Sequence, residues 1–366
     1  MAGCSCKRVP LRTLLYGLGR LLALAAACPD PAVDRFVLKA GWLIGSRKPK
    51  KSPCFKSPPN SLFIPLQVNL SPFKHSQPLN HLNKNSAVLL IHCPDRKGLV
   101  AAITRFLADH NGNILEIDQH VDKERKIFFM RAEWDLESFD IPADEIEQTF
   151  EQQIAHPFQM KWQLFFSRET PRMALFVSKF PHCLHDILAR YDSGDWNVEI
   201  PLIVSNHDDL KPVAEKYGIN FHRFHVTPDT KKTVEQEQKA LLEEYEIDVI
   251  VLARYMQILS PEFVSEWPAR IINIHHSFLP AFPGAKPYHS AYRRGVKVIG
   301  ATSHYVTSDL DQGPIIEQDV IHVDHSHSIE DLVRKGRDLE KIVLARAIWQ
   351  HLQRRTLVFE NRTIVF

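Results

Sequence analysis

From residue 172 onward, short apolar runs alternate with longer segments of helical length, and this alternation limits the fold more than any other feature of the sequence. The apolar runs have strand length and lie at 173–178, 200–205, 219–222, 248–253 and 271–274. The segments long enough for crossover helices lie at 183–189, 209–217 and 234–245. Strands that alternate with helices predict a mostly parallel, doubly wound sheet of the Rossmann-like α/β class. Ligands of such sheets bind beyond the carboxyl ends of the strands, so the residues that follow each strand are the candidate site residues.

Two polar motifs stand at such positions. In the first, Asn273 and His275 are two residues apart on an extended segment, so both are predicted to face one cavity while Ile274 packs behind them. An amide that donates hydrogen bonds beside an imidazole that carries protons suits acyl-group chemistry. The second motif, residues 309–314, contains carboxylates, one of which would orient His275. Taken alone, each motif also fits a purely structural role.

Taken together, the strings INIHHSFLPAFPG and GATSHYVTSDLDQGP resemble the folate-dependent formyltransferase family, which includes glycinamide ribonucleotide and methionyl-tRNA formyltransferases. The resemblance covers essentially all of 172–350. It implies that Asn273, His275 and Asp311 are catalytic, and that His304 is an additional active-site histidine that contacts the substrate. It also implies a folate pocket along the loop after the strand at 248–253. The residues expected to line that pocket are Arg254, Tyr255, Met256, Gln257, Ile258, Leu259 and Gly313.

Residues 86–167 precede this region and carry a different pattern. Apolar runs of strand length and helical spacings follow one another in the order βαββαβ, with a second helix expected at 141–154 and a fourth strand at 158–166. This order is that of the ferredoxin-like split motif. The string HCPDRKGLVAAITRFLADHNGNILEIDQHVD resembles the ACT domain, a small regulatory module that binds amino acids.

This second resemblance implies an amino-acid effector site at Asp95, Arg96, Gly98 and Asn113. Physically, a ligand carboxylate can bind the free backbone amides where the first helix begins. The alternative is that Gly98 only permits the turn and that the module joins the subunits of a homo-oligomer. The sequence leaves both interpretations open.

The loop after the first strand of the second domain bears on the identity of the formyl acceptor. Transfer to glycinamide ribonucleotide requires a glycine-rich phosphate cradle there, whereas Val177 to Leu184 contain no glycine and include Pro181. Nucleic acid is an equally poor partner, because residues 86–366 carry 32 Lys and Arg against 41 Asp and Glu, a net charge of −9. Water is the acceptor that remains.

An ACT domain followed by a formyltransferase-like domain with these motifs resembles the formyltetrahydrofolate deformylase family. The resemblance implies hydrolysis of 10-formyltetrahydrofolate to tetrahydrofolate and formate, which supplies purine synthesis and balances the one-carbon folate pool. Folate is then the substrate, and neither a cofactor nor a metal is expected. Two alternatives stay open: a formyltransferase that uses a small amine acceptor, and an amino-acid sensor without catalytic activity.

Four further features favour structural roles. Residues 322–327 (HVDHSH) contain histidines and an aspartate but lack complementary ligands at a telling spacing, so no metal site is predicted. Cys183 has no visible partner base and is expected to pack in the core. The charged segments 229–238 and 330–340 are expected to be solvated faces of helices, the latter within an amphipathic helix at 329–353.

Residues 1–85 form a basic leader with 13 Lys and Arg, two acidic residues and four of the six cysteines. Its apolar run at 21–27 is too short to span a bilayer. The leader has the features of a transit peptide or of a secretory signal, or it results from a start codon assigned too far upstream. Residues 47–85 have the composition of a disordered linker. The division expected is therefore a leader at 1–85, an ACT domain at 86–167 and a catalytic domain at 170–366. A cytoplasmic location without a membrane partner is predicted, or an organelle matrix if the leader is a transit peptide.

Overall fold

The computed structural model describes residues 85–281 and 287–366. The predictions about the leader fall on residues 1–84 and lie outside this part of the chain. Within the described residues, no helix has both the length and the apolar character needed to cross a membrane.

The first domain has the βαββαβ order predicted from the sequence. Its elements are β1 (Ser86–Pro94), α3 (Leu99–Asp109), β2 (Asn113–Asp122), β3 (Ile127–Asp135), α4 (Ile146–Phe150), the π-helical turn η1 (Glu151–Ala155), α5 (His156–Phe158) and β4 (Lys161–Phe166). The strands pair antiparallel in the order β2-β3-β1-β4. Alternate residues of the central strands, among them Leu89, Ile91 and Trp134, are buried against the helices and form the core.

The second helical segment of this domain differs from its prediction. It begins at Ile146 rather than at 141 and continues through η1 and α5 to Phe158, a residue that was wrongly assigned to the fourth strand. Gln159 adopts a left-handed conformation (φ 53°) that ends the helix, and the amide of Met160 donates to the carbonyl of Ala155 (2.9 Å). This cap delays the start of β4 to Lys161.

The second domain is an α/β fold. Its elements are β5 (Arg172–Val177), α6 (His182–Asp192), β6 (Glu199–Ser205), α7 (Lys211–Lys216), β7 (Asn220–Arg223), α8 (Lys231–Glu244), β8 (Val249–Ala253), α9 (Pro261–Ser265), β9 (Ile271–His275), α10 (Pro287–Arg294), β10 (Val298–Tyr305), β11 (Ile315–His322), α11 (Ile329–Leu352), β12 (Thr356–Phe359) and β13 (Arg362–Val365). A seven-stranded sheet has the order β11-β10-β9-β8-β5-β6-β7. The strands from β9 to β7 are parallel, while β10 and β11 are antiparallel additions at one edge.

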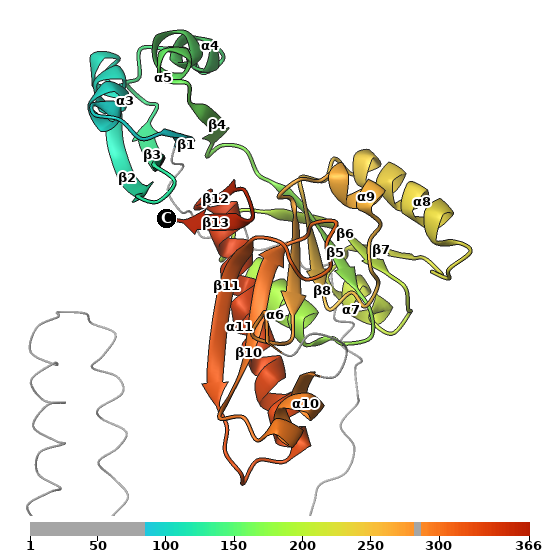
Figure 1. Cartoon of the computed structure of the whole chain (residues 1–366). Coiled ribbons are helices and arrows are strands. Elements are labelled where there is room, and N and C mark those ends of the chain that lie inside the picture. Colours follow the sequence, from blue (N-terminus) through green and yellow to red (C-terminus); the bar gives the residue numbers. More distant parts are fainter. Residues whose placement is uncertain (1–84, 282–286) are drawn as a thin grey trace, which may run out of the picture. The chain divides into compact units, whose positions relative to one another are not determined.

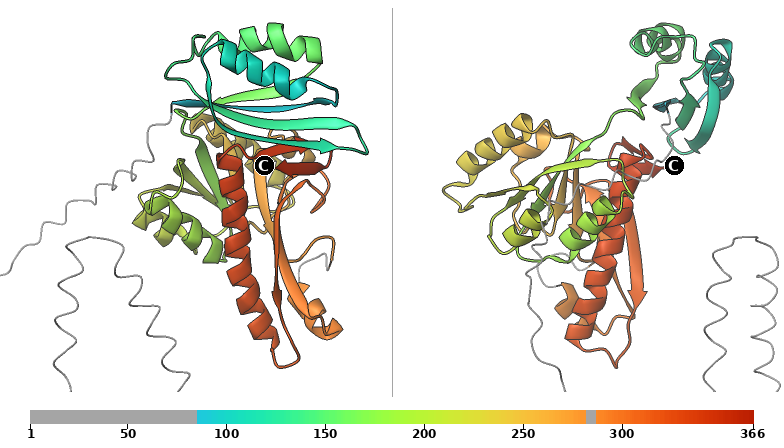
Figure 2. Two further views of the ribbon diagram at one scale, coloured as in Figure 1. Left: turned by 90° about the vertical axis from the view of Figure 1, so that its left-hand side faces the viewer. Right: turned by 180° about the vertical axis from the view of Figure 1, so that it is seen from behind.

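Helices cover both faces of this sheet, which explains why its central strands are apolar throughout (Figures 1 and 2). In β5, Met173, Leu175 and Val177 belong to the core formed with α6, α7 and α11. The intervening Ala174 and Phe176 belong to the core formed with α8 and α9. All five side chains are fully buried, so this strand shows no alternation between apolar and polar residues.

The direction in which the sheet grows changes between β5 and β8. The chain adds β6 and then β7 on one side of β5, and it returns to place β8 on the other side. The loops that leave β5 and β8 therefore diverge at the carboxyl edge of the sheet. Such a topological switch point is where open α/β sheets bind their ligands.

Candidate active site

Strands β9 and β10 supply three of the predicted site residues. Asn273 and His275 lie on β9, where β9 runs parallel to β8, and His304 lies opposite Asn273 on β10. Ile274 is 3% exposed and belongs to the sheet core, as the spacing predicted. Asn273 and His275 consequently project away from that core, near the carboxyl end of β9 where the chain leaves the sheet.

Asp311 reaches the same place from the loop between β10 and β11. Its backbone is left-handed (φ 57°), a conformation that aspartate tolerates better than most residues. Gly313 holds this loop against the end of β10, because a Cβ at that position would overlap the carbonyl oxygen of Tyr305. The amide of Tyr305 donates to the carbonyl of Pro314 (2.9 Å) and fixes the loop from the other side. Gly313 thus supports the position of Asp311 through the backbone.

The four side chains meet in one cluster. Asp311 contacts His275 (Nδ1···Oδ2 3.2 Å) and His304 (Nε2···Oδ1 3.7 Å). Asn273 lies against the same ring of His304 (Nδ2···Nε2 3.2 Å). His275 and His304 are 6% and 2% exposed, so water is largely excluded from both rings.

The hydrogen bonds assign the protons of His304. Its Nδ1 lies 2.9 Å from the carbonyl oxygen of Tyr305, which can only accept, so Nδ1 carries a proton. In the neutral ring Nε2 then accepts a hydrogen bond from the side-chain NH₂ group of Asn273, so the side-chain oxygen of Asn273 points away from His304. This arrangement fixes the orientation of the Asn273 amide.

Asp311 is held in its ionised form. A hydrogen bond from His275 and the nearby ring of His304 lower the pKa of this carboxyl well below its usual range, although partial burial acts in the opposite direction. An ionised Asp311 accepts a proton donated by Nδ1 of His275. It therefore orients that ring and stabilises it when the ring gains a second proton.

The remaining nitrogen of His275 is available for chemistry. Nε2 is buried and has no hydrogen-bond partner among the described residues. With Nδ1 protonated toward Asp311, the neutral ring carries its lone pair on Nε2. A buried lone pair beside a fixed carboxylate is the arrangement of a general base.

The predicted folate loop follows β8. Met256 and Ile258 are exposed apolar side chains, at 46% and 61%, whereas Tyr255 and Leu259 are buried. Ser178 fixes the loop by accepting from the amide of Met256 (3.0 Å) and donating to Asn206 Oδ1 (2.6 Å). The loop therefore presents an anchored backbone and two apolar side chains at the switch point.

Two polar residues of α8 also anchor this loop and were missed in the sequence. Gln238 donates to the hydroxyl of Tyr255 (3.3 Å), and Glu235 accepts from the amide of Ser260 (2.9 Å). Both are buried, so the prediction that 229–238 is a solvated face is wrong at these positions. The signal was present: Gln238 lies four residues from each of Val234 and Leu242 and so shares their buried stripe.

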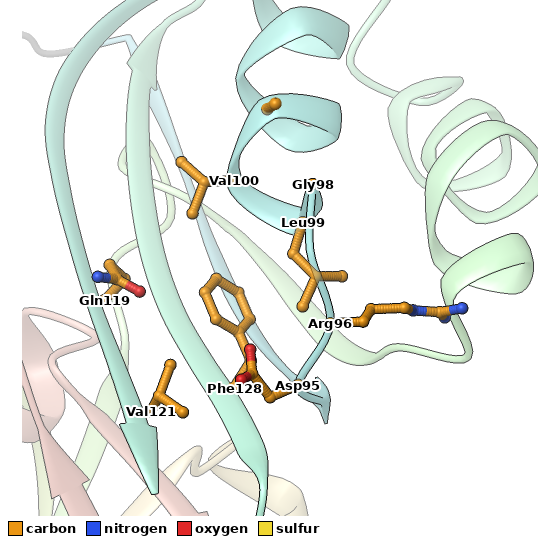
Figure 3. Close-up of a pocket in the computed structure, with 9 residues that line it drawn as sticks. Asp95, Arg96, Gly98, Leu99, Val100, Gln119, Val121 and Phe128 are labelled. Atoms are coloured by element: carbon orange, nitrogen blue, oxygen red, sulfur yellow. The ribbon is translucent and has the colours of Figure 1, made fainter. Parts of the chain in front are cut away.

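The predicted effector site coincides in part with a pocket of about 310 Å³ in the first domain (Figure 3). Asp95, Arg96 and Gly98 line it at the beginning of α3, together with Gln119 and Phe128. Gly98 has φ 92° and no side chain caps the helix, so the first amides of α3 lie open to a ligand. Asn113 is exposed at the start of β2 and does not line this pocket.

Comparison with known proteins agrees with this two-domain arrangement. The formyl transferase family model matches residues 171–348, and the ACT domain model matches residues 87–154. Formyltetrahydrofolate deformylase of Synechocystis is 53% identical over 281 residues, which are 77% of this chain and 98% of the relative. The Escherichia coli protein of the same name is 43% identical over 76% of this chain and 97% of its own length.

The chain belongs to the formyltetrahydrofolate deformylase family. The crystal structure of a formyltetrahydrofolate deformylase from Pseudomonas syringae is similar, with a TM-score of 0.75 and 47% identity over 77% of this chain and 94% of that one. A glycinamide ribonucleotide transformylase from Symbiobacterium toebii is also similar, with a TM-score of 0.52 and 28% identity. The aligned region is 56% of this chain and 98% of the transformylase, so only part of this chain resembles the transformylase.

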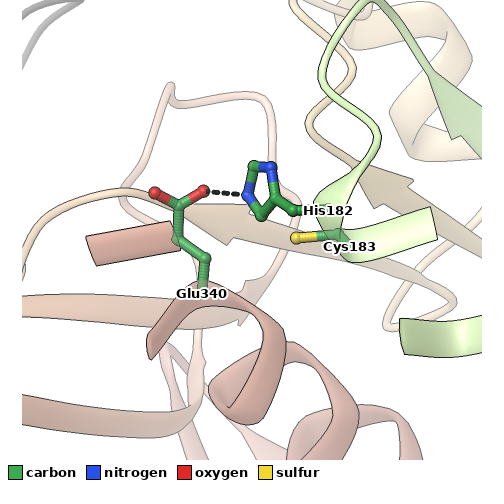
Figure 4. A group of neighbouring side chains, drawn as sticks. All are labelled: His182, Cys183 and Glu340. Atoms are coloured by element: carbon green, nitrogen blue, oxygen red, sulfur yellow. Dashed lines mark hydrogen bonds and ion pairs between the residues drawn. The ribbon is translucent and has the colours of Figure 1, made fainter. Parts of the chain in front are cut away.

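In this member of the deformylase family, a buried polar network lies at the switch point beside the predicted folate loop. Glu340 of α11 is 1% exposed and accepts a hydrogen bond from His182 Nε2 (2.9 Å) (Figure 4). It also accepts a hydrogen bond from the hydroxyl of Tyr288 (2.7 Å). Arg254 completes an ion pair with it (Nε···Oε2 3.3 Å). The side chain of Arg254, predicted to contact folate, is thus directed toward Glu340.

Burial and pairing determine the charges of this network. Burial acts to raise the pKa of Glu340, but the hydrogen bond from His182, the charge of Arg254 and the hydrogen bond from Tyr288 together hold it below its usual range. Burial and the neighbouring carboxylate raise the pKa of Tyr288, so its hydroxyl remains a donor. Glu340 was wrongly placed on a solvated face. Its position four residues after Gly336 and three before Val343 puts it on the buried stripe of α11.

His182, Cys183 and Glu340 place three potential metal ligands within 4.8 Å of one another. The chemistry of these donors does not favour a cation. Glu340 is already paired with Arg254, and burial followed by the charge of Glu340 raises the pKa of Cys183 well above its usual range, which keeps the thiol protonated. A metal-binding cysteine must be deprotonated. The fully buried Cys183 therefore fits the packing role that the sequence indicated.

Proposed function

We propose that the protein hydrolyses 10-formyltetrahydrofolate to tetrahydrofolate and formate. The relatives that match nearly all of their length to this chain carry the name of that activity. The observation that supports it most directly is the buried His275 with Nδ1 paired to Asp311 and Nε2 open. The formate released would supply purine synthesis and balance the pool of one-carbon folates.

In the proposed mechanism, His275 and Asp311 act first. Nε2 of His275 removes a proton from a water molecule as its oxygen attacks the formyl carbon, and ionised Asp311 stabilises the imidazolium that forms. The attack produces a tetrahedral intermediate with a negative oxygen. Asn273, whose amide is oriented by His304, stabilises this oxygen together with the protonated ring of His275.

The second half of the reaction breaks the bond between the formyl carbon and N10. Protonated His275 returns its proton to N10, which leaves as the secondary amine of tetrahydrofolate, while the carbon leaves as formic acid. The base of the first step is thus the acid of the second, and formic acid gives its remaining proton to solvent to become formate. No covalent intermediate with the protein is required, which agrees with the packing role of Cys183.

The test is an assay with 10-formyltetrahydrofolate as the sole substrate, in which tetrahydrofolate is followed by absorbance and formate by mass spectrometry. We expect equal amounts of both products without any added acceptor. Asn273→Ala is expected to lower kcat by about 10²–10³, the usual cost of a lost oxyanion donor. His275→Ala is expected to lower kcat by about 10²–10⁴, the usual contribution of a general base and acid, and folate binding should be nearly unchanged in both variants. A near-normal rate in either variant would contradict the assigned roles. Turnover that required an added amine would show a formyltransferase instead.

We also infer that the pocket at the start of α3 binds an amino acid that controls turnover. A ligand carboxylate would bind the open amides after Gly98, and Asp95 and Arg96 offer charges of both signs to an amino-acid head group. Glycine and methionine are the probes to use. We expect either to change kcat or KM of the full chain, and no change with any amino acid would refute the regulatory role. A change in oligomeric state alone would support the subunit-joining alternative.

A further inference from the structure

Side chains from four elements meet at the switch point. The loop that leaves β5 carries Phe180 and His182, and the loop that leaves β8 carries Arg254. Glu340 enters the space between them from α11, and Tyr288 enters from α10. The loop after β5 contains no glycine between Val177 and Leu184, so side chains occupy the place where the backbone amides of a glycine-rich loop could bind a phosphate.

The polar groups of this network are engaged with one another. Glu340 receives two hydrogen bonds and one ion pair, and its exposure of 1% leaves its carboxylate out of reach of solvent. Arg254 is 9% exposed and Tyr288 is 8% exposed. A phosphorylated ligand would have to separate Arg254 from Glu340 and leave a buried carboxylate without its counterion. Breaking a buried pair in this way costs about 3–5 kcal/mol.

Aromatic contacts close the network toward the surface. The guanidinium of Arg254 lies over one side of the Phe180 ring at 5.2 Å, and that of Arg337 lies over the ring at 5.6 Å. Contacts of this kind fix the position of a ring that is only partly buried. The Phe180 ring is thereby held between Arg254, which belongs to the network, and Arg337 of α11.

The network also reaches the catalytic residues. The ring of His276 lies 5.9 Å from that of Tyr288 and 5.2 Å from that of His275. Two ring contacts therefore connect Glu340's partner Tyr288 to the proposed base. A surface pocket of about 530 Å³ begins at His182 on the other side and is lined by α11 residues including Arg337, but by none of the proposed catalytic residues.

We propose that Phe180, His182, Tyr288 and Glu340 determine acceptor specificity: they occupy the space in which an amine acceptor would approach the formyl carbon and so restrict the acceptor to water. The inference rests on the proposed function. In both reactions the bond from the formyl carbon to N10 breaks and N10 gains a proton. The difference is whether an oxygen of water or the nitrogen of an amine forms the new bond to carbon.

Phe180→Ala and Tyr288→Ala test this role, because each removes ring volume without removing a charge. The probe is glycinamide, a small primary amine without a phosphate. Each enzyme is given 10-formyltetrahydrofolate with increasing glycinamide, and N-formylglycinamide and formate are quantified by mass spectrometry. The matched control is Phe221→Ala, which truncates another partly buried phenylalanine of the same domain, on β7.

We expect no formylglycinamide from the wild-type protein or from Phe221→Ala. In Phe180→Ala or Tyr288→Ala, the ratio of formylglycinamide to formate should be at least ten times the smallest ratio that the assay can detect. A ratio that stays at the wild-type value in both variants, when they are folded and release formate, overturns the inference.

A second measurement keeps the inference testable if the variants do not fold. In the wild-type protein, glycinamide should neither slow the release of formate nor act as an acceptor, because the network leaves no room for it. Competition by glycinamide, or amide product from the wild-type chain, would overturn the inference. Failure of the wild-type protein to release formate without an acceptor would instead refute the proposed hydrolysis, so the two ideas fail in different experiments.

Discussion

Gly336 offers a quantitative test of the network around Glu340, because two physical effects of Gly336→Ala have opposite signs. Gly336 lies within α11, where alanine is favoured over glycine by about 1 kcal/mol. A Cβ at this position would lie 2.5 Å from Cε1 of Tyr288 and closer still to its Cζ and Oη. Carbon atoms in contact are about 3.5–4.0 Å apart, so the Tyr288 ring must move by about 1 Å or more.

That movement carries two costs. Overpacking a core typically costs about 1–3 kcal/mol, and losing the hydrogen bond of 2.7 Å from Tyr288 to Glu340 leaves buried polar groups unsatisfied at about 1–3 kcal/mol. Set against the gain in helix propensity, Gly336→Ala should lower the free energy of unfolding by about 3 kcal/mol. For a domain of this size, the expected fall in Tm is about 6–12 °C.

The assay is urea and thermal unfolding of the full chain, with Arg334→Ala as an exposed control on the same helix, expected to change stability by less than about 0.5 kcal/mol. In a Tyr288→Ala background the obstacle is gone, and Gly336→Ala should then stabilise by up to about 1 kcal/mol. Stabilisation by Gly336→Ala in the wild-type background would refute the placement of Tyr288 beneath α11.

Three further outcomes follow from the site. Asp311→Asn should lose turnover, and at neutral pH its free energy of unfolding should be lower than that of the wild type. Because the pKa of Asp311 is lowered in the folded chain, this difference in stability should shrink as the pH falls below about 4. A difference that does not depend on pH in urea titrations would contradict the pairing of Asp311. Ser178→Ala frees the amide of Met256 and should raise KM about tenfold with kcat within twofold, and steady-state kinetics showing the reverse split would refute an anchoring role. Gly98→Ala strains a backbone at φ 92° and should weaken any effect of glycine or methionine while activity without effector is unchanged.

The parts of the structure that were predictable from sequence are those in which each residue type has one common environment. The apolar strand at 173–178 lies at the centre of the sheet, and the spacing of Asn273 and His275 places both on the side of the strand away from Ile274. The two-residue period of a strand is enough to derive this geometry. The approach of Asp311 required a turn of left-handed backbone that a single sequence does not announce.

The buried carboxylates were not predictable in the same way. Glu235 and Glu340 lie in helices rich in Lys, Arg and Glu, where the usual environment of a glutamate is solvent. Each is buried because its partner arrives from a distant part of the chain: the amide of Ser260 for Glu235, and Tyr288, Arg254 and His182 for Glu340. Periodicity identified the helices, and only the tertiary contacts identify which charges lie inside.

The left-handed backbone at Arg254 and Asp311 is a strain that the pairing of these two side chains outweighs. A residue with a Cβ gives up about 1–2 kcal/mol there relative to glycine. Glycine at 254 would relieve this strain but would leave the buried carboxylate of Glu340 without its counterion, at a cost of about 3–5 kcal/mol. Glycine at 311 would likewise give up the pairing with His275 that stabilises the folded chain. A laboratory population selected only for survival at high temperature should therefore keep arginine at 254 and aspartate at 311, although such a selection does not reward catalysis.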